Sequence, residues 1–306
     1  MQKFVDIALN LTDPMFNGIY RGSIIRKSDM EAVVSRAKIA GMVDAVLTGT
    51  TINSSIEAFN LAARFNLHST AGIHPTSSTE FDSTTTQKLL DLVRSDTFSR
   101  IVAIGECGLD YDRLEFASKE TQMEVFKHHF QIAKMTGLPM FLHNRNTAGD
   151  FLKVITENRD MFTGGVVHSF DSSKSEMEKI CGLGLYIGVN GWYILLFHTS
   201  SLKTEENVET VRAIPMDRLL VETDAPYCSM RPTHASHRFR SADTSVHVKK
   251  ERWFDGCIVK GRNEPYSAVH ILEVVAKIKG VDVCFLSRQV LKNTFSCFPG
   301  LLPATF

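Results

Sequence analysis

Short apolar runs alternate with longer segments of helical periodicity along most of this chain. Eight of the runs are rich in Val, Ile and Leu and mostly lack polar alternation, which is typical of parallel strands buried on both faces. They are Phe4–Leu9, Ala45–Thr48, Ser69–Ile73, Ile101–Ile104, Met140–Leu142, Gly165–Val167, Leu185–Val189 and Leu219–Val221. Because helical segments separate these runs, the pattern predicts an α/β fold, a closed (β/α)8 TIM barrel.

Local signals mark where several of the helices begin and end. Ser28–Glu31 has the form of a capping box, and its helix should end at Gly41. Ser173–Glu176 repeats this start signal, for a helix that ends near Cys181. A third helix is expected at Lys119–Thr136, because Gly and Pro follow it closely.

The chain beyond the eighth run predicts C-terminal helices at Ser267–Lys279 and Leu286–Phe295. No repeat, low-complexity stretch or linker divides the sequence, so residues 1–306 are expected to form one domain. The alternative fold is an open doubly wound sheet. That fold is less favoured, since no G-x-G-x-x-G follows the first strand.

Composition and charge narrow the classes of function. The 306 residues include 34 basic and 34 acidic side chains, and the resulting net charge of zero excludes a globally basic nucleic-acid coat. Any anion binding must therefore come from a local patch. The six cysteines form no C-x-x-C pair, which argues against a disulfide framework and a thiolate zinc site.

No membrane segment is expected. The longest apolar run, Trp192–Phe197, is far too short to cross a bilayer, and the N-terminal residues lack the apolar stretch of a signal peptide. The sequence is typical of a soluble protein of the nucleus or cytosol, and it shows no sign of an obligate protein partner.

Ionisable residues stand at the ends of five predicted strands. They are His74, Glu106, His143, His168 and Asp224. Because the carboxyl ends of barrel strands open onto one mouth, these side chains should converge there. Imidazole favours zinc-like ions, while carboxylates also bind magnesium or manganese, so the set predicts a site for divalent metal ions.

Each of these residues also has a purely structural interpretation. A single strand-end histidine is often only hydrogen-bonded, Asp224 could cap a following helix, and Glu106 could pair with Arg145. Their joint placement on successive strands favours the metal site, because packing does not require it. A nucleophilic Cys107 is the weaker scheme, since free cysteines are usually small buried hydrophobes.

A basic segment follows the eighth strand. Six cations lie in it against only Asp243 and Glu251; they are Arg231, Arg238, Arg240, Lys249, Lys250 and Arg252. At the mouth of a barrel this segment would suit a phosphate-bearing substrate. The alternative is a solvated loop whose charge has no specific role.

Four motifs together resemble the TatD family of metal-dependent deoxyribonucleases, most closely its eukaryotic branch, the TatD DNase domain-containing 1 proteins. They are G-E-C-G-L-D at 105–110, F-L-H-N-R at 141–145, V-V-H-S-F-D at 166–171 and E-T-D-A-P at 222–226. The resemblance covers essentially the whole chain. It implies a barrel of the metallo-dependent hydrolase type, hydrolysis of DNA phosphodiester bonds, and a nuclear location, with the cytoplasm as an alternative.

The resemblance also implies roles for the strand-end residues. Glu106 would bridge two divalent cations, with His143 and His168 binding one of them. Asp224 would bind the other and would orient or deprotonate the attacking water, so Glu106 and Asp224 are the expected catalytic residues. His74 and Arg145 would contact the DNA substrate.

The sequence departs from the family pattern at two places. Ala8 and Asn10 stand where many bacterial relatives have an H-x-H pair, so the ion next to Asp224 should bind more weakly. The apolar segment Trp192–Ser200 is longer than in relatives and should lie at the barrel mouth.

Two other functions therefore stay open. One is a metal-dependent hydrolase of a small cyclic amide or ester, which would have no use for the basic loop. The other is a catalytically weak nucleic-acid-binding protein, which the missing H-x-H pair favours and the four retained ligands oppose.

Overall fold

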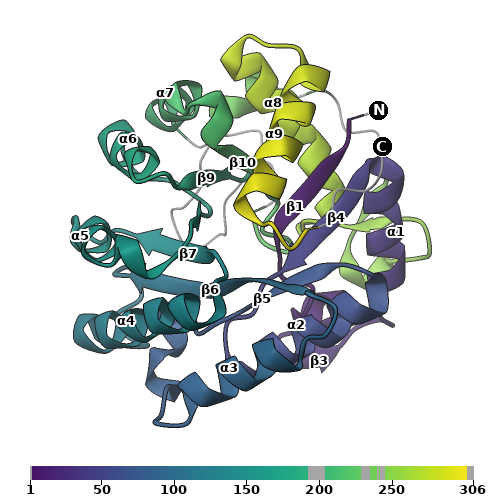
Figure 1. Cartoon of the computed structure of the whole chain (residues 1–306). Coiled ribbons are helices and arrows are strands. Elements are labelled where there is room, and N and C mark those ends of the chain that lie inside the picture. The colour runs from purple at the N-terminus through teal and green to yellow at the C-terminus, as the bar shows by residue number, and fades with distance from the viewer. Residues whose placement is uncertain (1, 192–203, 229–234, 240, 242–244, 302–306) are drawn as a thin grey trace.

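A computed structural model describes residues 2–191, 204–228, 235–239, 241 and 245–301. Its central sheet has eight parallel strands in the order β1-β4-β5-β6-β7-β8-β9-β10, surrounded by helices (Figure 1). These strands are β1 Phe4–Leu9, β4 Met42–Leu47, β5 His68–Ala71, β6 Ile101–Asp110, β7 Met140–Arg145, β8 Gly165–Val167, β9 Tyr186–Val189 and β10 Leu219–Val221. The predicted (β/α)8 barrel is confirmed.

The two end strands close the barrel near their carboxyl ends, where Thr223 also donates two hydrogen bonds to the buried Asp6 carboxylate. A single parallel bridge joins Leu9 to Ala225. The Asn10 N–H donates to the Ala225 carbonyl at 2.8 Å, and the Asp224 N–H donates to the Ala8 carbonyl at 3.0 Å. The closure therefore lies at the carboxyl ends of β1 and β10, beside Asp224.

Helices and short sheets fill the connections. The α-helices are α1 Met30–Ala40, α2 Ile52–Phe65, α3 Thr85–Ser95, α4 Lys119–Thr136, α5 Asp150–Glu157, α6 Lys174–Gly182, α7 Glu205–Ala213, α8 Ala268–Lys279 and α9 Val283–Cys297. The 3-10 helices are η1 Pro14–Asn17, η2 Pro75–Glu80, η3 Arg159–Met161, η4 Met216–Arg218, η5 Ala235–Phe239, η6 Lys250–Arg252 and η7 Pro265–Ser267. Two small sheets pair β2 Ile19–Tyr20 with β3 Ser23–Ile24 and β11 His247–Val248 with β12 Ile258–Val259. The C-terminal helices are as predicted, whereas the sequence did not predict the small sheets. Within the described ranges, no helix is both long and apolar enough to cross a bilayer.

Two of the predicted helix starts had different outcomes. Ser173 caps α6 as expected, accepting a hydrogen bond from the Glu176 N–H at 3.3 Å. The capping box at Ser28–Glu31 is wrong. Asp29 occupies the N-cap of α1, and its side chain makes no cap hydrogen bond. It is instead buried in an ion pair with Arg262, which outweighs the local signal.

β6 is six residues longer than the predicted Ile101–Ile104, so Glu106 lies inside a strand. Two glycines make the extension possible. A Cβ on Gly105 would lie 2.1 Å from the Phe141 carbonyl oxygen, and one on Gly108 would lie 1.9 Å from that of His143. Ile104 pairs with Met140 and Cys107 with Leu142, so β6 has one extra residue over this interval. This bulge redirects the side chains at the point where Glu106 leaves the regular pleat.

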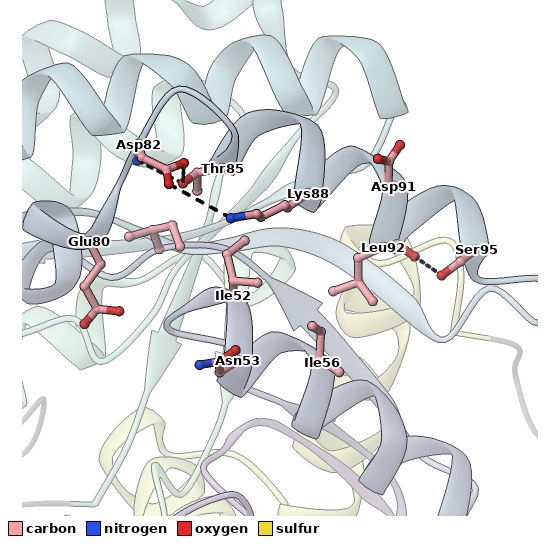
Figure 2. Close-up of a pocket in the computed structure, with 11 residues that line it drawn as sticks. Ile52, Asn53, Ile56, Glu80, Asp82, Thr85, Lys88, Asp91, Leu92 and Ser95 are labelled. Carbon is pink, nitrogen blue, oxygen red and sulfur yellow. Dashed lines mark hydrogen bonds and ion pairs between the residues drawn. The ribbon is translucent and has the colours of Figure 1, made fainter.

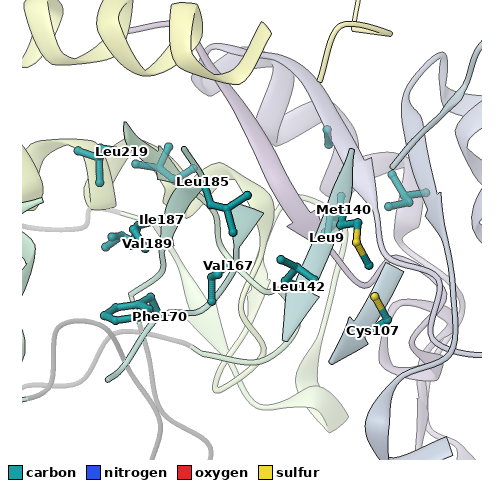
Figure 3. Packing of buried hydrophobic residues seen from close by; sticks show 14 of the residues in the cluster. Leu9, Cys107, Met140, Leu142, Val167, Phe170, Leu185, Ile187, Val189 and Leu219 are labelled. Atoms are coloured by element: carbon teal, nitrogen blue, oxygen red, sulfur yellow. The ribbon is translucent and has the colours of Figure 1, made fainter. Parts of the chain in front are cut away.

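Two apolar clusters form the core. One lies between the strands and the surrounding helices and includes Cys107, Leu142 and Val167 (Figure 3). The other joins residues from strands around the whole barrel, so it fills the interior; its strand members are Val5, Ile7, Ala8, Val46, Val102, Ala103, Phe141, Val166 and Leu220. The segment from α9 to Leu301 covers one end of this interior, where Asn293 donates to the Leu219 carbonyl at the start of β10. The opposite end is the mouth.

Candidate metal centre

The polar residues of the site follow the apolar interior residues on the same inward-facing side of each strand. Along β7, Phe141, His143 and Arg145 share one face, because strand side chains alternate with period two. On β8, His168 follows the interior residue Val166 by the same spacing. The Phe141 and His168 rings stack with centroids 4.6 Å apart. The apolar interior is therefore the floor of the polar site.

Glu106 lies among three histidines. Its Oε1 atom is 2.9 Å from Nδ1 of His143, 2.8 Å from Nε2 of His168 and 3.3 Å from Nε2 of His74. The two nearer nitrogens are 3.4 Å from each other. All four side chains are buried. Such an arrangement of donor atoms in a buried place needs a shared positive charge, which a proton or a metal ion can supply.

The pKa shifts have the same cause. Burial alone would raise the pKa of Glu106, but His168 and His74 hold it well below its ordinary value. Burial would lower the pKa of His168, but the Glu106 carboxylate holds it well above its usual range. Burial lowers the pKa of His74, although Glu106 opposes that change. The neighbouring histidines therefore favour the ionised form of Glu106, the form that metal coordination requires.

Two carboxylates stand behind the two nearer histidines. Nε2 of His143 lies 3.2 Å from Oδ2 of Asp110, and Nδ1 of His168 lies 3.6 Å from Oε1 of Glu222. Asp110 and Glu222 have no exposed surface. In protein metal sites such outer carboxylates fix the tautomer and the orientation of the ligand imidazole. The ring nitrogens that face Glu106 are thus the ones positioned for a metal ion.

Asp224 faces the same cavity from the opposite side. Its Oδ1 accepts a hydrogen bond from Nδ2 of Asn10 at 2.8 Å, and its Oδ2 accepts one from the Cys228 thiol at 3.2 Å. Burial raises its pKa to about 6, and the nearby Glu222 and Glu106 add to the effect while His168 opposes it. Both carboxylate oxygens of Asp224 thus accept hydrogen bonds from other side chains. Asp224 does not cap a following helix, so that alternative interpretation of the sequence is wrong.

The turn that carries Asp224 is held by Asn263. Its side-chain amide donates to the Thr223 carbonyl at 3.0 Å and to the Cys228 carbonyl at 3.3 Å. Its backbone N–H donates to the Pro226 carbonyl at 2.9 Å. Asn263 is buried, so these bonds do not compete with water.

A single cavity of about 560 Å³ joins these groups. All six predicted site residues line it; they are His74, Glu106, His143, Arg145, His168 and Asp224. Two triads have ligand atoms close enough to share an ion, namely Glu106–His143–His168 and His74–Asp110–His143, and Asp224 belongs to neither. The donor set of imidazole and carboxylate groups fits a divalent ion such as zinc, manganese or magnesium.

The remaining structural alternatives are also resolved. Nη1 of Arg145 lies 3.5 Å from Oδ2 of Asp110, so Arg145 pairs with Asp110 and not with Glu106. Cys107 is fully buried in the outer cluster, and burial raises the pKa of its thiol well above the usual range (Figure 3). It does not line the cavity and is no nucleophile for it.

A second hollow of about 650 Å³ lies between α2 and α3 (Figure 2). Ile52, Ile56, Ile73 and Leu92 form its apolar part. Its Asp82 carboxylate accepts hydrogen bonds from Thr84 and Thr85, and Lys88 lies 4.0 Å away. Its described lining residues include no histidine. This hollow therefore lacks the donor set of a hydrolytic metal site.

The basic segment is only partly described. Arg238 forms a two-pronged ion pair with Glu205 of α7. Lys249 and Arg252 are exposed and Lys250 is half-buried. Arg231, Arg240 and the predicted segment Trp192–Ser200 lie outside the described residues.

Sequence reasoning missed Asp110 and Glu222, although both belong to the recognised motifs at 105–110 and 222–226. Their signal was a carboxylate near a strand end, one strand away from a histidine for Asp110 and two strands away for Glu222. The pairing became visible only with the register, which places Asp110 opposite Arg145, two residues beyond His143.

Asp110→Asn should weaken metal binding without unfolding the protein. The change removes the negative charge behind His143 but keeps the shape, and loss of such an outer partner costs about 10- to 100-fold in affinity. Titration calorimetry with Mn²⁺ measures the effect. Asp112→Asn, an exposed neighbour, is the matched control and should bind like wild type. Equal affinity in Asp110→Asn and wild type would show that His143 needs no anionic partner.

Comparison with known proteins gives a consistent result. A model of TatD related DNases matches residues 5–299. The deoxyribonuclease Tat-D of Schizosaccharomyces pombe is 40% identical over 96% of this chain and 95% of its own length. A putative deoxyribonuclease TATDN1 homolog of Encephalitozoon cuniculi is 35% identical over 97% of this chain and 96% of its own. The structure of a hydrolase TatD family protein from Entamoeba histolytica has a TM-score of 0.88 at 31% identity, covering 97% of this chain and 98% of that one. The chain belongs to the family of TatD related DNases.

Proposed function

We propose that this protein is a metal-dependent deoxyribonuclease that hydrolyses DNA phosphodiester bonds. The observation that carries the proposal is the convergence of Glu106, His143 and His168 on one point of a cavity that Asp224 also lines. The names of the relatives from Schizosaccharomyces pombe and Encephalitozoon cuniculi support DNA as the substrate.

The donor atoms suggest how metal ions would be held. Nδ1 of His143 and Nε2 of His168 would bind one ion together with Glu106. Asp224 would bind the other, with Glu106 shared between them. Magnesium, manganese and zinc all accept such ligands.

When bound, one or two divalent ions would neutralise charge on the scissile phosphate and lower the pKa of a water molecule. Asp224 would accept the proton of the attacking water, because its carboxylate lines the cavity together with Glu106 and the histidines. His74 and Arg145 would orient the phosphate from the cavity wall. The second triad, His74–Asp110–His143, keeps His74 close to the reacting groups.

The test is cleavage of a labelled DNA strand by chelator-treated protein after addition of Mg²⁺, Mn²⁺ or Zn²⁺. We expect cleavage with at least one ion and none in EDTA. Parallel assays with a cyclic amide and a carboxylic ester address the small-molecule hydrolase. Turnover of these without any DNA cleavage would overturn the proposal, and binding of DNA without turnover of any substrate would favour the weak nucleic-acid-binding protein.

Asn10→His should tighten binding of the ion next to Asp224. Asn10 already points its amide at Oδ1 of Asp224, and an imidazole there would add a nitrogen ligand. We expect calorimetry to show about a tenfold or greater gain in Mn²⁺ affinity at this site, because one more protein ligand would hold the ion. Asn53→His, at an exposed position on α2, is the control. Unchanged stoichiometry and affinity would argue against metal binding beside Asp224.

Two further expectations belong to this proposal. We infer that residues 1–306 act as one domain, supported by the hydrogen bond between Ser287 of α9 and Lys3 before β1. We also propose that the protein resides in the nucleus, where its substrate is concentrated. Fractionation of cells that express tagged protein tests the second point, and an exclusively cytoplasmic signal would contradict it.

A further inference from the structure

Cations and aromatic rings form a cluster between two loops that are far apart in the sequence. Arg26 lies 5.0 Å from the centre of the Trp253 ring and 6.0 Å from that of Tyr20. Lys27 lies 5.7 Å from the Trp253 ring, and Lys250 lies 4.8 Å from the Tyr20 ring. We call these five residues the cation–aromatic cluster. It joins the loop after β1 to the loop after β10.

The members of the cluster differ in their access to solvent. The side chain of Arg26 is only 5% exposed, pairs with Asp29 at 3.0 Å and donates to the Met15 carbonyl at 3.0 Å. Arg26 therefore has a structural role within the cluster. The side chains of Lys27 and Lys250 are 68% and 34% exposed, so these two ammonium groups reach solvent from fixed aromatic supports.

The cluster lies beside the mouth of the barrel. Both of its loops follow the carboxyl ends of strands, and β1 and β10 are the two strands that close the barrel. Pro14 lines the catalytic cavity, and the carbonyl of the next residue, Met15, accepts the hydrogen bond from Arg26. Asp224 and Asn10 face the cavity from these same loops. A polymer that leaves the cavity on this side must pass the cluster.

The surroundings of the cluster are strongly basic in a chain whose net charge is zero. Among the described residues of the two loops, the solvent-facing cations are Arg21, Lys27, Lys249, Lys250, Arg252 and Lys260, together with Arg238, which pairs with Glu205 of α7. Only two described carboxylates stand among them, Glu251 at 3.9 Å from Lys250 and Asp255 at 3.2 Å from Lys27. Ion pairs this exposed are weak, so a phosphate can displace them.

We propose that Lys27 and Lys250 form a docking site for the phosphate backbone of a DNA single strand whose scissile bond lies in the catalytic cavity. The proposal rests on the proposed function. Cations already lie over both rings. The lysines therefore contact the phosphates, and Trp253 and Tyr20 hold the lysine side chains in place. Binding here is independent of base sequence and sensitive to salt.

The test compares wild type with Lys27→Glu/Lys250→Glu. Affinity for a labelled 20-nucleotide single strand is measured in EDTA, which prevents hydrolysis, from about 50 to 200 mM NaCl. Each lost phosphate contact reduces the slope of log K against log salt by about 0.7, so we expect the slope of the double variant to fall by about 1.4. We also expect at least about a tenfold weaker affinity at the lowest salt, where counterion release is largest.

Two controls separate this proposal from the proposed function. Lys292→Glu makes the same charge change at an exposed position on α9, near the covered end of the barrel, and should leave the slope unchanged. Hydrolysis of bis(4-nitrophenyl) phosphate, which has no flanking phosphates for the lysines to bind, should persist in the double variant. Equal slopes in wild type and double variant overturn the docking site, as does parallel loss of small-substrate hydrolysis. Failure of wild type to cleave any phosphodiester would overturn only the proposed function.

Trp253→Leu tests the role of the rings. Leucine keeps an apolar side chain but removes the aromatic support of Lys27, so we expect an intermediate loss of affinity with normal hydrolysis of the small substrate. Wild-type affinity in this variant would overturn the claim that the ring positions the lysine.

Discussion

Glu106→Gln should reduce DNA cleavage by a factor of about 10² to 10³, the usual cost of removing one preorganised group that stabilises the transition state. Glu106 is the group that three histidines face, and glutamine cannot supply its negative charge. Metal affinity should fall together with the rate. The measurement is cleavage of a labelled DNA strand in saturating Mn²⁺, with calorimetry for the ion.

The shape of the side chain is unchanged by this substitution, so the thermal unfolding midpoint should differ little from wild type. Glu80→Gln, in the hollow between α2 and α3, makes the same chemical change outside the barrel interior and should keep full activity. Wild-type cleavage by Glu106→Gln would mean that the histidine cluster is only a structural feature.

Arg262→Met should lower the free energy of unfolding by about 3 to 5 kcal/mol, the usual cost of removing one partner from a buried ion pair. Nη1 and Nη2 of Arg262 each lie 2.7 Å from an oxygen of Asp29, and Nη2 lies 2.6 Å from Glu264. The Arg262 side chain is 1% exposed, so water cannot replace it. Arg26 and Arg36 remain near the two carboxylates, but neither can take the central position.

Urea titration followed by circular dichroism measures this loss. Arg94→Met is the matched control, since Arg94 pairs with Asp91 at 3.7 Å on the exposed face of α3 and should matter little. Because Arg262 precedes Asn263, which holds the turn around Asp224, the variant should also bind metal less tightly than wild type. A stability equal to that of Arg94→Met would show that the network is dispensable.

The fold was predictable because its strands are mostly apolar and lack regular polar alternation. Burial on both faces leaves a strong local signal, and every predicted strand overlaps an observed one. The length of β6 was not predictable, since Gly105 and Gly108 interrupt the apolar run and resemble the end of a strand. Their real role is to let β6 approach β7, and this depends on a partner more than 30 residues away.

The candidate site shows the same division between local and long-range information. Strand-end residues such as Glu106 and His168 could be named from the sequence, because a barrel brings all strand ends together. Their outer partners required the register between strands. The sequence could not predict the cation–aromatic cluster. Tyr20 and Trp253 are more than 230 residues apart, and a cation from one loop contacts the ring of the other only after the barrel closes.

The place where the barrel closes has a consequence for how long the folded protein survives. β1 and β10 share one bridge and two nearby backbone hydrogen bonds, at the point where Asn10 and Asp224 face the cavity, and Thr223 adds two hydrogen bonds to the Asp6 carboxylate. With a single bridge between its strands, this junction is the natural place for local opening. An ion held between Asp224 and Glu106, as proposed above, would bind the closed form, and each tenfold rise in its free concentration above the dissociation constant would add about 1.4 kcal/mol to closure. Cation supply would thus set the protein's resistance to proteolysis and turnover in the cell, independently of how fast it cleaves DNA.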